Sequence, residues 1–174
     1  MRFPLSLFVL TLPFLLAHPA MAVTGDETSV DAPSVTRSTY QDWQSTCVLL
    51  EEKPACEITQ TMQLEKDGQT SFAMRITLIK QADKTVMEIA LPLGLDLPAG
   101  IALQVDENNE INIPFVTCVA QGCAAVVVTE DEFLNELRQG TELKVAYRPF
   151  GQTQAVVLVS SLRGFTSAIQ LLAD

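Results

Sequence analysis

Apolar and polar residues alternate along much of the chain, and this alternation predicts β-strands. In residues 56–64 and 72–78 nearly every second side chain is apolar, which is typical of strands with one buried and one solvated face. The Asp67-Gly68 dipeptide between these two runs is a strong signal for a tight hairpin. Gln60 interrupts the apolar face of the first strand, so it is expected to need a hydrogen-bond partner.

Further short apolar runs continue this pattern towards the end of the chain. They predict strands over residues 85–91, 101–105, 111–117, 124–128, 142–148 and 154–159. The run at 124–128 is apolar at every position and predicts a strand that is buried on both faces. Short strands at intervals of roughly ten residues are typical of an antiparallel β-sandwich or barrel, so the fold class is predicted to be all-β.

Residues 91–100 (LPLGLDLPAG) interrupt the strands with prolines and glycines. Pro92 and Pro98 cannot donate to a ladder, which predicts an irregular or edge segment. The leucines at every second position of this segment are still expected to point inward.

Two short helices are expected in the last third of the chain. Thr129 followed by Glu132 is typical of a capping box, and Gly140 is a typical helix end, so the intervening residues predict one short helix. Residues 166–172 predict a second short helix.

Residues 1–22 have the features of a cleavable signal peptide. Arg2 supplies a positive start, residues 5–17 are mostly apolar, and cleavage is expected near Ala22. The apolar stretch is shorter than the ~20 residues that a membrane span requires. The protein is therefore expected to be exported to the periplasm, the extracellular medium or the cell surface, and not to span a membrane.

The exported part is predicted to divide into a tail and one domain. Residues 23–38 have few large apolar side chains and predict a flexible N-terminal tail. The domain then covers residues 39–174, and Trp43, the only tryptophan, is expected to be an anchor of its core.

The exported part contains four cysteines: Cys47, Cys56, Cys118 and Cys123. An even number of cysteines in an exported chain favours disulfides. The C-x8-C and C-x4-C spacings do not match the paired C-x2-C spacing of structural zinc sites, so no metal is expected. Four cysteines allow three pairings. The turn-forming residues inside each short spacing favour Cys47–Cys56 and Cys118–Cys123, while a long-range pairing stays open.

Charge and histidine content argue against several classes of function. The chain has 11 Lys and Arg against 21 Asp and Glu, a net charge of −10 that repels the phosphates of nucleic acids. The single histidine, His18, lies in the predicted signal peptide, so the exported part has neither a histidine-based catalytic triad nor a histidine metal ligand. Asp106, Asn108 and Glu110 resemble the start of a calcium loop, but the required glycine and closing glutamate are missing, which predicts a polar turn. No cofactor is expected.

Segments spread over almost the whole exported part carry a family resemblance. These segments are residues 40–43 leading to Cys47, residues 56–58, 91–94, 98–106, 114–118 and 122–123, and residues 161–169. The Pro-Phe-x-Thr-Cys stretch at 114–118 and the Gly-Phe-Thr stretch at 164–166 are the most specific. In their order and spacing over residues 39–173 these segments resemble the invasion-associated locus B family of Gram-negative bacteria. The resemblance implies a secreted or periplasmic immunoglobulin-like β-sandwich with paired cysteines, and it implies no catalytic residue.

These observations together predict a non-enzymatic exported protein that binds another protein in the cell envelope or in host contact. Sheet edges and residues 91–100 are candidate docking surfaces. The alternative is a periplasmic small-molecule or lipid-binding module with its ligand between the sheets. Carboxylate-only catalysis requires two acids that face each other across a cleft, and no such pair is marked by the sequence. The identity of the partner and the oligomeric state stay open.

Overall fold

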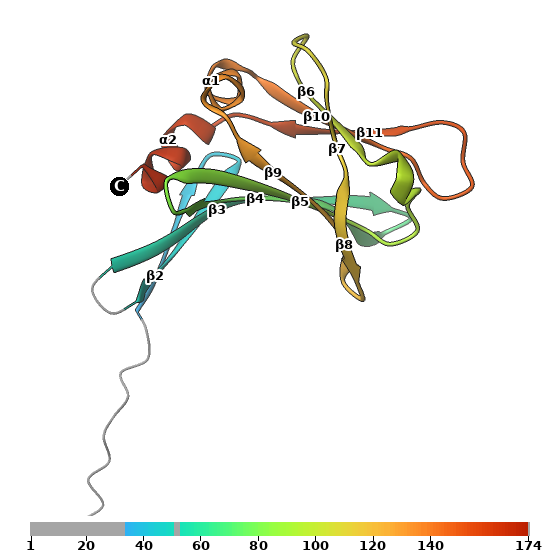
Figure 1. Cartoon of the computed structure of the whole chain (residues 1–174). Coiled ribbons are helices and arrows are strands. Elements are labelled where there is room, and N and C mark those ends of the chain that lie inside the picture. The colour runs from blue at the N-terminus through green and yellow to red at the C-terminus, as the bar shows by residue number, and fades with distance from the viewer. Residues whose placement is uncertain (1–33, 51–52, 174) are drawn as a thin grey trace, which may run out of the picture. The chain divides into compact units, whose positions relative to one another are not determined.

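The structure, a computed structural model, describes residues 34–50 and 53–173 of the 174-residue chain. The predicted signal peptide and residues 23–33 of the predicted tail lie outside the described residues. The strands within the described residues form two antiparallel sheets (Figure 1). The large sheet has the order β1-β2-β3-β4-β5-β9-β8, and the small sheet has the order β11-β10-β6-β7. The predicted all-β sandwich with short helices is confirmed.

The strands and helices are numbered in chain order. Their bounds are β1 Val35–Tyr40, β2 Trp43–Leu50, β3 Lys53–Lys66, β4 Gln69–Gln81, β5 Lys84–Leu91, β6 Ile101–Val105, β7 Ile111–Ile113, β8 Phe115–Val119, β9 Gly122–Thr129, α1 Asp131–Gln139, β10 Glu142–Tyr147, β11 Val156–Ser161 and α2 Phe165–Ile169. Two short 3₁₀ turns, Leu97–Ala99 and Gln170–Leu172, complete the set. In the described part of the chain, no helix combines the length and the apolar character that crossing a lipid bilayer requires.

The β3–β4 hairpin forms the centre of the large sheet. Its turn residues Asp67 and Gly68 both have positive φ, 52° and 73°, as a two-residue type I′ turn requires. Both strands extend beyond the predicted ranges 56–64 and 72–78. Near the turn β3 and β4 lengthen by pairing with each other, and at the far end they also pair with β2 and β5. The predicted hairpin is confirmed, and pairing with neighbours lengthens it.

The core lies between the two sheets and is built from one face of each. Its fully buried side chains include Trp43, Ile58, Ile76, Leu78, Met87 and Ile89 from the large sheet and Leu103, Leu143 and Val145 from the small sheet. Phe165 at the start of α2 packs its ring against Trp43 in an edge-to-face arrangement, with ring centroids 5.0 Å apart and an interplanar angle of 68°. Trp43 is therefore a core anchor, as predicted.

Gln60 joins the large sheet to the end of β11. Its Nε2 donates to the carbonyl oxygens of Asp42 (3.1 Å) and Ser161 (2.9 Å), and its Oε1 accepts from the Ser160 hydroxyl. Trp43 Nε1 donates to the same Ser161 carbonyl over 3.0 Å. Ser160 is fully buried, so its hydroxyl depends on the Gln60 acceptor. The expectation that Gln60 needs a partner is confirmed.

The chain changes sheet at Pro114. β7 pairs with β6 in the small sheet, whereas β8 pairs with β9 in the large sheet. A proline has no N–H to donate to a ladder, which is the physical reason why the first strand ends there. The prediction of one continuous strand over residues 111–117 is therefore wrong.

β9 is buried on one face only. Ala125 is fully buried against the core, while Val128 on the opposite face is 42% exposed. No described element covers that face of the large sheet. The prediction that residues 124–128 are buried on both faces is wrong, and the apolar run marks an exposed surface instead.

β1 begins inside the segment that was predicted to be a flexible tail. Val35 lies opposite Val48 of β2, and Arg37 lies opposite Thr46. The side chains of β1 are exposed as far as Thr39. Backbone pairing rather than side-chain burial makes this strand, so the composition of residues 23–38 carried no sign of it.

α1 does not begin with the predicted capping box. Its N-cap residue is Glu130, and no side chain caps it. The Thr129 hydroxyl donates instead to the Thr85 carbonyl over 2.9 Å, because Thr129 still belongs to β9 and lies opposite Thr85 in the sheet. The helix itself is confirmed and buries Leu134 and Leu137. The second predicted helix is observed as α2 and the 3₁₀ turn after it.

Candidate functional site

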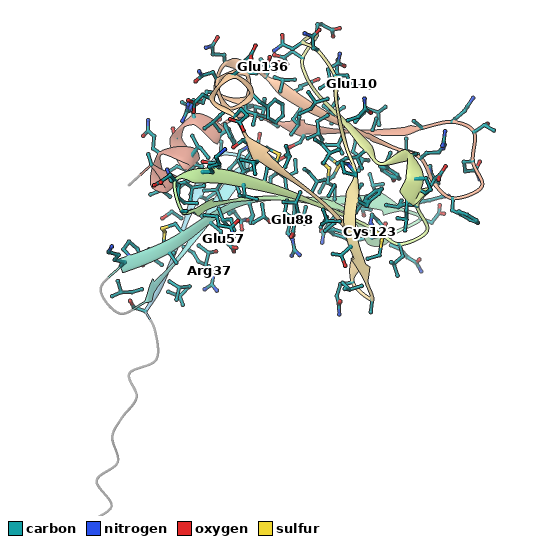
Figure 2. The ribbon with its side chains drawn as sticks, viewed as in Figure 1. Arg37, Glu57, Glu88, Glu110, Cys123 and Glu136 are labelled. Carbon is teal, nitrogen blue, oxygen red and sulfur yellow. A yellow bond between two sulfur atoms is a disulfide. The ribbon has the colours of Figure 1, made fainter. Side chains whose placement is uncertain are left out.

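The face of the large sheet that points away from the small sheet is not covered by any described element, and we call it the outer face. The strand register brings its residues into three rows: Arg37-Thr46-Glu57-Ile79-Val86-Val128, Thr39-Gln44-Thr59-Thr77-Glu88-Val126 and Thr61-Arg75-Ala90-Ala124. Figure 2 shows Arg37, Glu57 and Glu88 on this side of the large sheet. These rows alternate with the buried residues of the same strands, so they form one continuous surface.

A hollow of about 540 Å³ lies at the centre of the outer face. It is lined by Glu57, Thr59, Arg75, Thr77, Ile79, Val86, Glu88 and Val126. The lining comes from the four adjacent strands β3, β4, β5 and β9. Regular backbone pairing between these strands therefore fixes the relative positions of the lining residues.

Four charged side chains of the outer face form no ion pair with another described residue. They are Arg37, Glu57, Arg75 and Glu88, and none of them belongs to the ion pairs within the described part of the chain. Two positive and two negative charges make this surface electrically balanced although the chain as a whole carries −10. Free charges of both signs can pair with complementary charges on a partner and so orient it.

Exposed apolar side chains of β4, β8 and β9 accompany these charges on the outer face. Ile79 is 38% exposed, Val128 is 42% exposed, and Val119 at the β8–β9 turn is 56% exposed. Ile79 and Val128 lie in one row of the register on either side of Val86, and an apolar surface rimmed by polar residues is typical of an interaction site. Sequence reasoning missed this surface because it assigned the apolar run of β9 to the core.

Glu57 and Glu88 are the two acids that line the hollow. They lie two strands apart and one row apart in the register. Ordinary strand spacing and rise place their Cα atoms roughly 12 Å apart. Glu88 is exposed and Glu57 is half-buried.

The leucines of residues 91–100 do not all point inward. Leu91 and Leu95 are buried, but Leu93 is 55% exposed and Leu97 is 45% exposed. The reason is that the backbone leaves the extended conformation after β5, so alternation no longer keeps all four leucines on one face. The expectation is wrong for two of the four.

Leu93 and Leu97 lie on a segment that is tied to the loop between β10 and β11. Phe150 of that loop is 78% exposed, and its backbone N–H donates to the Gly94 carbonyl over 2.8 Å. The predicted docking segment is thus held in place by the backbone and presents apolar side chains to solvent. It is a second exposed surface, separate from the hollow of the outer face.

The four cysteines form two disulfides between neighbouring strands. Cys47 is bonded to Cys56 across β2 and β3, and Cys118 is bonded to Cys123 across β8 and β9. Both pairs are directly opposed in the register, with Cα atoms 4.0 Å apart. The disulfides fasten strands on either side of the central hollow, and neither of them lines it.

Asp106 binds the start of β10 and does not line the hollow of the outer face. Its carboxylate accepts from the Thr141 hydroxyl (2.7 Å), the Thr141 backbone N–H (3.1 Å) and the Glu142 backbone N–H (2.9 Å). The hydroxyl of Thr141 lowers the pKa of Asp106 most; partial burial opposes this effect, and the two backbone donors add to it. The carboxylate that resembled the start of a calcium loop is thus engaged by protein donors, and no metal-binding group of three such side chains occurs in the part of the chain that the structure describes.

The space between the two sheets is occupied by side chains. Leu78 and Ile89 of the large sheet and Leu103 and Val145 of the small sheet are fully buried there. Dense packing of this kind is the usual state of a protein core. The leucine-rich inner faces that suggested a ligand between the sheets serve here as the core itself.

Comparison with known proteins supplies the family. The model of the invasion associated locus B (IalB) protein family matches residues 43–173. The chain belongs to this family. The segments that carried the resemblance in the sequence fall within the match except for residues 40–42, and the resemblance is confirmed.

Relatives from two genera share most of this IalB-family chain. An Invasion protein B homolog of Brucella abortus is 30% identical over 136 residues, which are 78% of each chain. Invasion protein B of Bartonella bacilliformis is 25% identical over 160 residues, 90% of this chain and 84% of that protein. The crystal structure of invasion associated protein B from Bartonella henselae has a TM-score of 0.69 and 25% identity, and the match covers 79% of this chain and 94% of that one.

Proposed function

We propose that this IalB-family chain is an exported envelope protein that binds another protein through its outer face and catalyses no reaction. The observation that carries the proposal is the combination of free charges of both signs, a central hollow and a border of exposed valine and isoleucine on one rigid sheet. Apolar contact would supply affinity, and the charges would set orientation and exclude wrong partners.

Export is the second element of the proposal. Residues 1–22 act as a signal peptide that is cleaved near Ala22, and the exported domain begins with β1 at Val35 instead of at the predicted residue 39. Two disulfides support this location, because they persist in oxidising compartments such as the periplasm and the cell surface.

Host contact is one setting in which the protein could bind its partner. The printed names of the Brucella and Bartonella relatives refer to invasion. An envelope partner in the same cell is the other setting. Both settings require the same exposed surface.

The test is site-specific photocrosslinking in cells that produce the full chain. A photoreactive residue at Thr77 reports on the centre of the hollow, and the same residue at Asn112, an exposed strand position of the small sheet, is the matched control. We expect a discrete crosslinked partner from Thr77 and none from Asn112. Charge reversal by Glu88→Lys should weaken the Thr77 crosslink without lowering the unfolding midpoint. Equal crosslinking at both positions, or none at Thr77, contradicts the proposed role of the outer face.

Location and oxidation state are tested on the same cells. Fractionation should recover a chain that lacks residues 1–22 and has no free thiol. Retention in the cytosol with the leader attached, or reduced cysteines in the purified chain, contradicts export. Turnover of a substrate by the purified chain contradicts the non-enzymatic role.

A further inference from the structure

Within the described residues, strand β11 pairs only with β10 and so has an open edge in the small sheet (Figure 1). The Leu162 N–H donates to the Thr141 carbonyl over 2.9 Å, which fixes the phase of this ladder. Hydrogen-bonded and non-hydrogen-bonded pairs alternate along antiparallel strands. Ser160, Leu158 and Val156 therefore direct their backbone N–H and C=O groups to β10. The intervening residues Val157, Val159 and Ser161 therefore turn their N–H and C=O groups towards the open edge.

Two of these three residues are free to receive another strand. The Ser161 carbonyl already accepts from the side chains of Trp43 and Gln60. Val157 and Val159 have no such partner among the described residues, and their side chains are 54% and 43% exposed. The open part of the edge thus offers backbone groups together with exposed β-branched side chains.

The other strands at the margins of the sheets carry features that discourage strand addition, whereas β11 does not. β1 includes Arg37, the three-residue β7 is followed by Pro114, and β8 has a register irregularity at Val116. Charges, prolines and bulges are the usual protections of edge strands. β11 has six residues, VVLVSS, with no charge, no proline and an unbroken register.

Charge makes a second copy the matching occupant of this edge. No acidic residue lies within residues 143–173 although the chain carries −10. The three cations of this stretch each pair with an acid: Lys144 with Glu107 (3.0 Å), Arg148 with Asp96 (2.6 Å) and Arg163 with Asp42 (4.0 Å). The exposed Glu142 lies opposite Ser161, at the end of β11 away from Val157. Residues 143–173 contribute no unpaired charge, so two copies of an acidic protein can approach at Val157 and Val159 with little like-charge repulsion.

We propose that two copies of the chain join antiparallel through β11, about a two-fold axis at Leu158. In this register Val157 lies opposite the partner's Val159, and each such pair exchanges two backbone hydrogen bonds. The two small sheets become one continuous sheet, and the opposed valines form cross-strand pairs on its solvent side. A register centred on Val159 would require the Ser161 carbonyl, which is already engaged.

The symmetry of the contact limits the assembly to a dimer. An isologous interface uses the same strand in both copies, so no open β11 edge remains after two copies have joined. The interface leaves the outer face free, and the proposal is therefore independent of the proposed function.

The test is sedimentation equilibrium of the mature chain from micromolar to millimolar concentration. We expect a reversible monomer–dimer equilibrium without larger species. Val157→Pro removes a donor at the open edge but none from the ladder with β10, and it should weaken dimerisation about tenfold because two symmetry-related bonds are lost. Val159→Lys should weaken dimerisation at least as much, because it places a charge at the junction.

Matched variants separate the interface from general effects on folding. Val128→Lys changes a valine that is 42% exposed, close to the 43% of Val159, but on a strand that is paired on both sides, so dimerisation should be unchanged. Val157→Thr keeps both the N–H and the branched shape, and it should dimerise like the parent chain. Loss of dimerisation in either control contradicts the interface.

Amide hydrogen exchange rates test the same interface without any substitution. The amides of Val157 and Val159 should exchange more slowly as the protein concentration rises, while the Leu158 amide, already bonded to β10, should not change. A monomer at every concentration overturns the proposal. So does a dimer that withstands both Val157→Pro and Val159→Lys and leaves the two edge amides unprotected.

Discussion

Replacing Gly164 with alanine should strongly destabilise the fold. Gly164 precedes α2 with φ of 86°, a conformation that side chains with a Cβ rarely adopt. A Cβ at this position would overlap the carbonyl oxygen of Tyr40 and lie 2.6 Å from its carbonyl carbon. The next residue, Phe165, packs against Trp43 in the core, so the start of α2 cannot move away without opening that contact.

The size of the effect follows from two contributions. The left-handed conformation costs an alanine about 1–2 kcal/mol relative to glycine. The overlap with the backbone at Tyr40 adds about 1–3 kcal/mol, the usual cost of overpacking. Gly164→Ala should therefore lower the free energy of unfolding by about 2–5 kcal/mol, a large part of the roughly 5–15 kcal/mol that holds a typical domain together.

The assay is urea unfolding of the mature chain, followed by the fluorescence of its single tryptophan, Trp43. Gly151→Ala is the matched control, because Gly151 has φ of 76° but open space around the position of an added Cβ. The control measures the conformational cost alone, and the difference between the two variants measures the contact with Tyr40. Equal losses of stability in Gly164→Ala and Gly151→Ala would refute the reasoning.

Two polar contacts give further predictions. Gln60→Leu should lower the free energy of unfolding by about 1–3 kcal/mol, because it leaves the buried Ser160 hydroxyl without its acceptor. Adding Ser160→Ala should restore part of that loss, and a purely additive double-mutant cycle would contradict the contact. Asp106→Asn should cost about 1 kcal/mol at neutral pH, a value discounted for partial exposure. The pKa of Asp106 is lowered below 3.8, so its stabilisation is complete above that pH and is lost as the pH falls through the lower folded-state value. Urea midpoints of the parent and the variant should therefore converge in strong acid, and a difference that persists there would count against the role of the ionised carboxylate.

The sequence by itself determined the local elements of this protein. Alternating side chains in 56–64 and 72–78 predicted two strands, and Asp67-Gly68 predicted the turn that joins them, because period and turn chemistry are local properties of the chain. The sequence also predicted that Gln60, which interrupts the apolar face of its strand, has a hydrogen-bond partner, since a buried amide group must be hydrogen-bonded. The spaced motifs were enough to indicate the family that the family model then matched.

Only the tertiary structure decided which faces and edges stay uncovered. The apolar run at 124–128 fits a strand buried on both faces as well as one that exposes Val128, and the difference depends on whether a distant element covers it. Pro114 could be recognised as a strand breaker, but the change of sheet depends on pairing with β6 and β9. The outer face and the open edge of β11 arise from the order of strands in two sheets. That order is set by contacts between residues far apart in the sequence, which no local pattern encodes.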